Sequence, residues 1–130
     1  MFTIAILTWL AGALAQLFPP PPPPRLPDAA AGDRVFRVCA PCHTGNQGGP
    51  HKIGPNLFGM MDQPAGKRAD FRYSNALIAK AATGLIWNED ALRAYLADPR
   101  AFLPGGSKAF AGIKDEQRMA DLIAYLRTLK

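Results

Sequence analysis

The pentapeptide Cys39-Ala40-Pro41-Cys42-His43 constrains this chain more than any other stretch. It holds both cysteines of the chain and one of its two histidines. A C-x-x-C-H sequence is typical of a c-type haem attachment site. Two thiols at this spacing can each add across a haem vinyl group, and the histidine that follows can place an imidazole nitrogen under the iron. A chain that anchors haem in this way has to fold around a flat, largely apolar group.

Two other uses of the pentapeptide are open at this point. The cysteine pair could be a redox disulfide, although such pairs usually belong to a βαβ unit and no strand-like pattern precedes Cys39. The pair could also bind zinc with His43 and His51, although structural zinc sites usually separate two ligand pairs by a longer loop. His43 directly follows Cys42, which is an awkward geometry for closing a tetrahedron. The pentapeptide therefore favours haem over both alternatives.

The length and charge of the chain limit what surrounds this motif. With 130 residues the chain has room for one small domain and its tails. A covalently held apolar cofactor would enlarge the modest core that such a domain can bury. The chain has 15 Lys and Arg against 10 Asp and Glu, a formal net charge of +5. The basic residues are scattered and form no nucleic-acid-binding motif, so we expect acidic partners and no nucleic acid.

The first 27 residues differ in composition from the rest of the chain. Residues 1–15 form an uncharged apolar run that ends in Ala13-Leu14-Ala15, a small-x-small sequence typical of a signal-peptide cleavage site. The run contains no Lys or Arg, so an uncleaved membrane anchor is the alternative. Residues 16–27 include six consecutive prolines, which favour an extended polyproline II spacer. We therefore expect an exported, periplasmic protein whose folded domain covers residues 28–130.

Capping residues and apolar spacing predict an all-α domain. Helices are expected over 29–38, over 75–82, from 89 to a stop at Pro99, and from near Asp115 to the chain end, with three N-caps: Asp28, Ser74 and Asn88. The apolar residues of the last helix recur at i, i+3, i+4 and i+7: Met119, Leu122, Ile123 and Leu126. No stretch predicts a strand.

The segment between residues 44 and 72 predicts a long loop. It is rich in glycine and proline, which interrupt any regular period. A loop of this length in a compact domain indicates that function shapes it, and packing around a flat cofactor is such a function. His51 lies in this segment, and we expect it to brace the loop by hydrogen bonding rather than to bind a metal.

Taken in chain order, these motifs resemble the class I cytochromes c of mitochondria and α-proteobacteria. The resemblance covers residues 32–129. It is carried by the following stretches: Gly32-Asp33-Arg34-Val35-Phe36, Cys39-Ala40-Pro41-Cys42-His43-Thr44, His51-Lys52-Ile53-Gly54-Pro55-Asn56-Leu57-Phe58-Gly59, Phe71-Arg72-Tyr73-Ser74, Gly84-Leu85-Ile86-Trp87, Tyr95-Leu96-Ala97-Asp98-Pro99, Pro104-Gly105, Phe110-Ala111-Gly112-Ile113 and Asp121-Leu122-Ile123-Ala124-Tyr125-Leu126. So many specific motifs in one order remove the zinc and disulfide alternatives.

The resemblance implies the class I cytochrome c fold, with a few helices and long loops around one covalent haem c. Cys39 and Cys42 would form the thioether bonds to this haem, and His43 would be the proximal iron ligand. The carbonyl of Pro55 would accept the other ring N–H of His43, as metal-bound histidines generally require.

The resemblance also implies roles for four aromatic residues and one helix contact. Tyr73 and Trp87 would hydrogen-bond the haem propionates. Tyr95 would lie on the distal side, and Phe110 would lie beside the exposed haem edge. The first helix would pack against the last through four residues: Gly32, Phe36, Leu122 and Tyr125.

The chain departs from the family pattern at two positions. The family's distal methionine lies in a P-G-T-K-M-x-F-x-G segment, which here reads Pro104-Gly105-Gly106-Ser107-Lys108-Ala109-Phe110-Ala111-Gly112, so Lys108 takes the methionine position. Lys108 could bind the iron as a neutral amine and lower the reduction potential, or it could point to solvent and leave the sixth site open. The second departure is Gln63, where the family usually has an arginine near a propionate.

The resemblance implies an exported electron carrier of a respiratory or photosynthetic chain. Its partners would be acidic faces of redox proteins, such as an oxidase or a cytochrome bc-type complex. A membrane tether formed by the N-terminus is a further possibility at this point. It would not be an enzyme, apart from a weak peroxidase activity that an open sixth site would allow. The alternative function is a haem-based sensor or small-ligand-binding protein that uses the open distal position.

Overall fold

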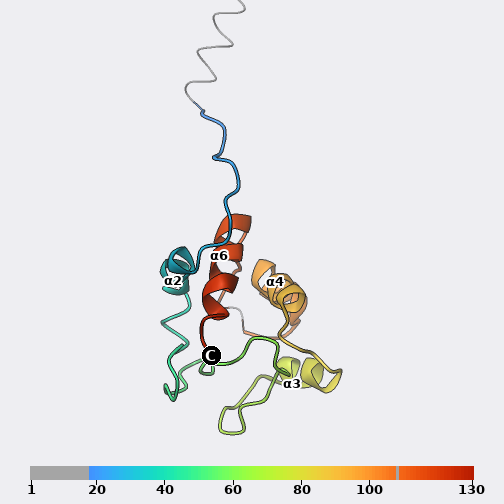
Figure 1. The fold of residues 1–130 in the computed structure, drawn as a ribbon. Helices are drawn as coiled ribbons and strands as arrows, with labels where there is room; N and C mark the ends of the chain where they lie inside the picture. The colour runs from blue at the N-terminus through green and yellow to red at the C-terminus, as the bar shows by residue number, and fades with distance from the viewer. Residues whose placement is uncertain (1–17, 108) are drawn as a thin grey trace, which may run out of the picture.

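A computed structural model describes residues 18–107 and 109–130 of the chain. The described residues form five helices joined by long irregular segments (Figure 1): α2 (Ala29–Phe36), α3 (Asn75–Ala82), α4 (Glu89–Ala97), α5 (Pro99–Phe102) and α6 (Glu116–Leu126). Their only β pairing is an isolated bridge between Pro64 and Ile86. The predicted all-α class is therefore confirmed. The predicted signal peptide at 1–15 and Lys108 lie outside the described residues.

All three predicted N-caps are confirmed, and Asp115 caps α6 in the same way. Each side chain accepts a hydrogen bond from a backbone N–H two or three residues later, which satisfies an otherwise unpaired donor of the first helical turn: Asp28, Ser74, Asn88 and Asp115. No helix in residues 18–107 and 109–130 combines the length and apolar character needed to span a bilayer.

Two helix ends differ from the prediction. The last helix, α6, ends at Leu126 and does not continue to the chain end. The first helix, α2, ends at Phe36, two residues earlier than expected, and the chain continues in turns to Cys42. The N–H groups of residues 37, 38 and 39 bond three rather than four residues back, so the helix tightens into turns before Pro41, which has no N–H to continue the bonding. Pro99 ends α4 as predicted, but it also begins the short helix α5, where its missing N–H costs nothing.

The first and last helices pack closely, as the sequence predicts (Figure 1). A Cβ at Gly32 would lie 2.7 Å from Cβ of Tyr125 and closer still to the backbone carbonyl of Asp121. Only glycine allows this approach of the two backbones. One turn further along α2, the rings of Phe36 and Tyr125 lie 5.2 Å apart between centroids.

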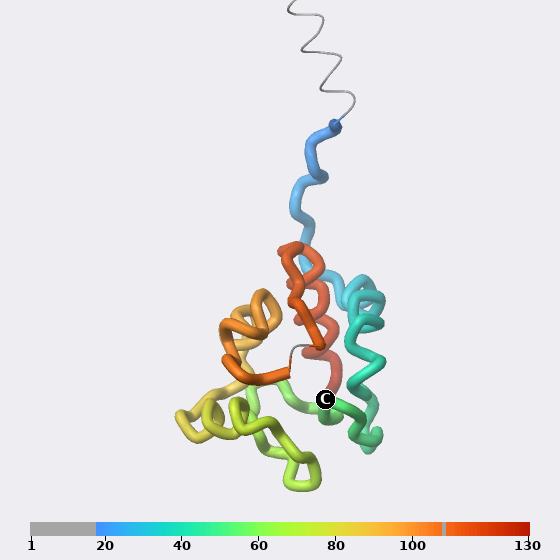
Figure 2. The backbone as a smooth tube through the Cα atoms, turned by 180° about the vertical axis from the view of Figure 1, so that it is seen from behind, coloured from blue at the N-terminus to red at the C-terminus, as the bar shows by residue number. Residues whose placement is uncertain are grey.

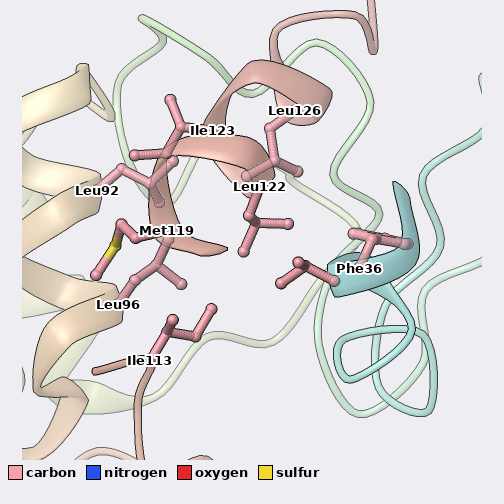
Figure 3. Packing of buried hydrophobic residues seen from close by; sticks show 9 residues of the cluster. Phe36, Leu92, Leu96, Ile113, Met119, Leu122, Ile123 and Leu126 are labelled. Carbon is pink, nitrogen blue, oxygen red and sulfur yellow. The ribbon is translucent and has the colours of Figure 1, made fainter. Parts of the chain in front are cut away.

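The hydrophobic core joins these two helices to α4 (Figure 3). All four residues of the predicted apolar stripe on α6 are buried, and Leu122 is only 1% exposed. The core cluster comprises Val35, Phe36, Leu92, Leu96, Ile113, Met119, Leu122, Ile123 and Leu126. This core lies on one side of the site that is described below.

The proline segment extends away from the helices, and its C-terminal end, next to the domain, is fastened to α6 (Figures 1 and 2). The guanidinium of Arg25 donates to both carboxylate oxygens of Asp121, at 3.0 and 2.5 Å. The Asp121 side chain is only 3% exposed, and it also accepts from the backbone N–H of Asp28 and from Gln117. Burial disfavours the charged form of Asp121, but these hydrogen bonds outweigh it and hold the pKa of the carboxyl below its usual range.

Replacing Arg25 by Gln should lower the melting temperature at pH 7 by a few degrees, because buried Asp121 loses its charged partner. The folded-state pKa of Asp121 is lowered, so the stabilisation is complete above the unfolded pKa of about 3.9 and disappears as the pH falls through the folded pKa. The difference between wild type and Arg25→Gln should therefore shrink below about pH 4. Thermal melts followed by circular dichroism measure both effects.

Arg34→Gln is the matched control, because Arg34 is an exposed arginine on α2. It should leave the melting temperature unchanged at every pH. Equal melting temperatures for wild type and Arg25→Gln at pH 7 would contradict the stabilising role of the Arg25–Asp121 pair.

Candidate cofactor site

A cavity of about 980 Å³ opens beside the core. This volume lies at the upper end of the range of about 300–1,000 Å³ that is usual for cofactor and ligand sites. Four leucines belong to both the core cluster and the cavity wall: Leu92, Leu96, Leu122 and Leu126. An apolar group placed in the cavity would therefore continue the hydrophobic core without a break.

The pentapeptide forms part of the cavity wall. Cys39, Cys42 and His43 all line the cavity, and the two cysteines are not joined by a disulfide. The turn that follows α2 brings them together, since the N–H of His43 donates to the carbonyl of Cys39 at 2.9 Å. Burial raises the pKa of the Cys39 thiol to about 11, and the neighbouring Cys42 thiol adds to the effect.

A hydrogen bond to the Pro55 carbonyl fixes the orientation of the His43 ring. Its Nδ1 lies 2.7 Å from the carbonyl oxygen of Pro55. A carbonyl can only accept, so Nδ1 carries the proton and Nε2 keeps a lone pair for a metal. Burial lowers the pKa of His43, and the hydrogen bond to Pro55 offsets this only in part, so the imidazole is neutral at pH 7.

Gly54 gives this imidazole its space. A Cβ at residue 54 would lie 2.6 Å from each ring nitrogen of His43. The ring therefore packs directly against the backbone that precedes Pro55. The fit of His43 depends on this glycine as well as on the carbonyl that accepts its proton.

Asn56 holds the long loop in place. It is 5% exposed, and its side-chain amide donates to Oγ1 of Thr44 and to the carbonyl of Asn46, both at 2.8 Å. Its backbone N–H donates to Nδ1 of His51 at 3.0 Å, while Nε2 of His51 lies 2.9 Å from Asp70. The prediction that His51 braces the loop by hydrogen bonding is confirmed.

The aromatic residues predicted from the resemblance line the same cavity: Tyr73, Trp87, Tyr95 and Phe110. The rings of Trp87 and Tyr95 are in contact, with centroids 5.4 Å apart. Burial raises the pKa of Tyr95, and the thiol of Cys39 contributes to this shift. The hydroxyl oxygen of Tyr73 accepts from the backbone N–H of Arg68 at 3.0 Å, which leaves its own O–H free to donate.

The structure thus brings eight predicted site residues to one cavity: Cys39, Cys42, His43, Pro55, Tyr73, Trp87, Tyr95 and Phe110. The ninth, Lys108, lies outside the described residues, although both of its neighbours, Ser107 and Ala109, line the cavity.

The sequence did not predict that the charged residues of the cavity lining are all basic. The charged residues among those that line it are Lys67, Arg68 and Arg72, and no Asp or Glu occurs in the described lining. Their positions follow no motif, and in the sequence they read as scattered surface charges. Their nearness to Tyr73 in the chain is the one signal that could have identified them.

The residues present fit a haem c. Two thiols and a neutral imidazole with a free Nε2 meet at one wall, leucines and aromatic rings cover the apolar surfaces, and basic groups stand where acidic substituents would be neutralised. Outside this cavity, the described residues contain no group of three or more His, Cys, Asp or Glu side chains that could hold a metal ion.

Comparison with known proteins gives one consistent family. The family described as "Cytochrome c" matches residues 29–130. Cytochrome c2 of Blastochloris viridis is 42% identical over 100 residues, which cover 77% of this chain and 76% of that protein. Cytochrome c2 of Rhodospirillum rubrum is 44% identical over 79% of this chain and 82% of its own length. Cytochrome c of Chlamydomonas reinhardtii is 44% identical over 77% and 88%.

Replacing Gly54 by Ala should displace the ring of His43, because the new Cβ would overlap it. We expect a loss of about 1–3 kcal/mol in the free energy of unfolding, which is usual for overpacking. We also expect a changed Soret band, because the imidazole moves. Guanidinium unfolding and absorption spectra of the holoprotein measure these effects.

Gly45→Ala is the control in the same loop. Its Cβ would lie 3.2 Å from the end of the Leu129 side chain, a flexible group that can move, and at an ordinary contact distance of 3.5 Å from the ring of Phe36. We expect a loss below about 1 kcal/mol and an unchanged Soret band. Equal losses and equal spectra for the two variants would show that the contact with His43 is not the cause.

Proposed function

The chain belongs to the cytochrome c family, and from this premise we propose that it is an exported, periplasmic electron carrier in a respiratory or photosynthetic chain. Membership implies one covalently attached haem c and a role in electron transport. One observation supports the proposed electron carrier: Cys39, Cys42 and His43 line the same cavity as the predicted aromatic residues. The relatives are cytochromes c and c2, which favours an electron carrier over a small-ligand sensor.

We assign the attachment roles to the pentapeptide. Cys39 and Cys42 would hold the haem by thioether bonds, and Nε2 of His43 would bind the iron. The bound haem supplies the one-electron redox change. The Pro55 carbonyl keeps the proton of His43 on Nδ1 and so preserves Nε2 as a ligand.

The remaining residues would control the surroundings of the haem. Tyr73 and Trp87 would donate hydrogen bonds to the propionates, and Tyr95 would lie on the distal side. Phe110 would cover the exposed edge through which electrons enter and leave. The leucine walls exclude water, and burial of this kind is one of the features by which proteins tune haem potentials.

The proposal includes a sixth position without methionine. The segment from Pro104 to Gly112 contains no methionine. Met119 is buried in the core at 3% exposure and does not line the cavity. Met60 lines the cavity but belongs to the loop that carries Pro55. Lys108 would therefore either bind the iron or leave its sixth position open.

The rim of the cavity suits a transient acidic partner. Among the residues that line the cavity, Lys67 and Arg72 are exposed and basic, while Val38 and Ile53 are apolar and 49% and 77% exposed. Basic groups steer an acidic protein toward this face, and apolar groups allow brief close contact. We propose this rim as the docking face for an oxidase or a cytochrome bc-type complex.

Reversing two rim charges should slow electron exchange. In the double variant Lys67→Glu, Arg72→Glu, the second-order rate constant with an isolated cytochrome bc-type complex should fall about tenfold at low ionic strength. Wild type and variant should converge as salt screens the charges over about 8–10 Å. Stopped-flow absorbance of the haem measures this rate.

The control is the double variant Arg34→Glu, Arg118→Glu, which makes the same change in net charge at exposed residues that do not line the cavity. It should keep most of the wild-type rate. Equal slowing in both double variants would refute the rim as the docking face. A wild-type rate constant that does not change with ionic strength would refute it as well.

Replacing Lys108 by Met should restore a thioether at the sixth position. The reduction potential should rise by roughly 100 mV or more, since axial ligands set haem potentials over a range of about 0.8 V. The charge-transfer band of methionine-bound ferric haem should appear in the variant and be absent from wild type. A redox titration and an absorption spectrum measure these changes. A wild-type protein that already shows the band would refute the proposal.

A further inference from the structure

The cavity has a basic corner that the established family roles leave unexplained. All three charged residues in its described lining are basic, and Arg68 is the one that is half-buried. Lys67 and Arg72 are exposed, so water and salt weaken their fields. A charge-compensating group for a buried or half-buried anion is therefore best sought at Arg68.

Gln63 makes such a group necessary. Its side chain is neutral and exposed at the rim, where it lies 3.5 Å from the ammonium of Lys67. It therefore supplies no positive charge to the cavity. A haem brings two propionate carboxylates into this site, and carboxylates at a low-dielectric surface need charged or hydrogen-bonding partners.

Arg68 is held in position for this task. Its Nη2 donates to the carbonyl of Phe58 and lies 3.4 Å from the side-chain oxygen of buried Asn56. Its backbone N–H donates to the hydroxyl of Tyr73, a residue expected to contact a propionate. The structure gives Nε and Nη1 of Arg68 no hydrogen-bond partner among residues 18–107 and 109–130, so each of these two groups has an N–H donor available.

We infer that Arg68, together with Tyr73, forms a binding site for a haem propionate and supplies the positive charge that Gln63 does not. The planar guanidinium, held by Phe58, keeps its charge and its remaining N–H donors in fixed directions, which the flexible ammonium of a lysine does not. Arg68 acts on the cofactor itself and is a binding residue. This inference rests on the proposed haem site.

The consequence lies in the reduction potential and its dependence on pH. A cation beside the propionate favours the ionised carboxylate and the reduced, less positive iron. An opposite charge within about 4–6 Å usually lowers a carboxyl pKa by one unit or more. In Arg68→Gln the propionate pKa should therefore rise by about one unit, a tenfold change in its ionisation constant, and the potential at pH 7 should fall.

The test is a spectroelectrochemical titration of the holoprotein from pH 4 to pH 9. In Arg68→Gln the pH at which the potential changes should move upward by about one unit. Lys67→Gln removes the same charge from the exposed rim and should leave that pH unchanged. Arg68→Lys keeps the charge without the fixed planar donors, so its upward shift should be smaller than that of Arg68→Gln.

Other titrating groups near Arg68 need their own control. Asp70 lies within electrostatic reach of Arg68 and pairs with His51, and Arg72 is the remaining basic neighbour in the lining. Asp70→Asn and Arg72→Gln should both keep the wild-type pH of the transition. A transition that disappears in Asp70→Asn would assign it to the His51–Asp70 pair and overturn the inference.

The outcomes separate the inference from the proposed function. If Arg68→Gln lowers only the melting temperature and leaves the pH profile in place, Arg68 merely braces the loop and the inference is overturned. The same holds if Arg68→Gln and Lys67→Gln move the profile equally. If the proposed haem site is wrong, a pyridine haemochrome assay of the wild-type protein would instead detect no covalent haem.

Discussion

The hydrogen bond from His43 to the Pro55 carbonyl holds the site together. It joins the turn after α2 to the loop of residues 44–72, which has no helix or strand of its own to fix its course. Asn56 adds to this connection, because its side chain donates a hydrogen bond to Thr44 and its backbone N–H donates one to His51. The position of one imidazole and the path of the whole loop are thus parts of one hydrogen-bonded network.

The cavity and the core depend on each other in the same way. Four leucines belong both to the core and to the cavity wall: Leu92 and Leu96 from α4, and Leu122 and Leu126 from α6. Without an apolar occupant, these leucines would border a cavity far larger than the small voids usual in packed protein interiors. The close contact of α2 with α6 at Gly32 completes the other side of the core. A covalent haem would therefore stabilise the fold as well as supply its redox chemistry.

Local signals account for what could be predicted from the sequence. The caps at Asp28, Ser74, Asn88 and Asp115 act within three residues, so the starts of α2, α3, α4 and α6 were predicted correctly. The four-residue helix α5 was missed because Pro99 was interpreted only as a stop. Arg68 was missed because its place depends on Phe58 and Asn56, 10 and 12 residues earlier, and such pairings leave no mark in composition or spacing.

The two departures from the family pattern act on the haem from different directions. In the proposed site, Lys108 in the methionine position would change the ligand on the iron, whereas the neutral Gln63 would change only the field around the propionates. A propionate carries its charge at the edge of the ring, so a nearby cation can compensate for Gln63, and Arg68 stands in the right corner to do so. No cation can replace a thioether, because the soft sulfur stabilises reduced iron through a bond. In the proposed site, the distal ligand would therefore have the larger influence on the potential, and the propionate partners would adjust it within the range which that ligand allows.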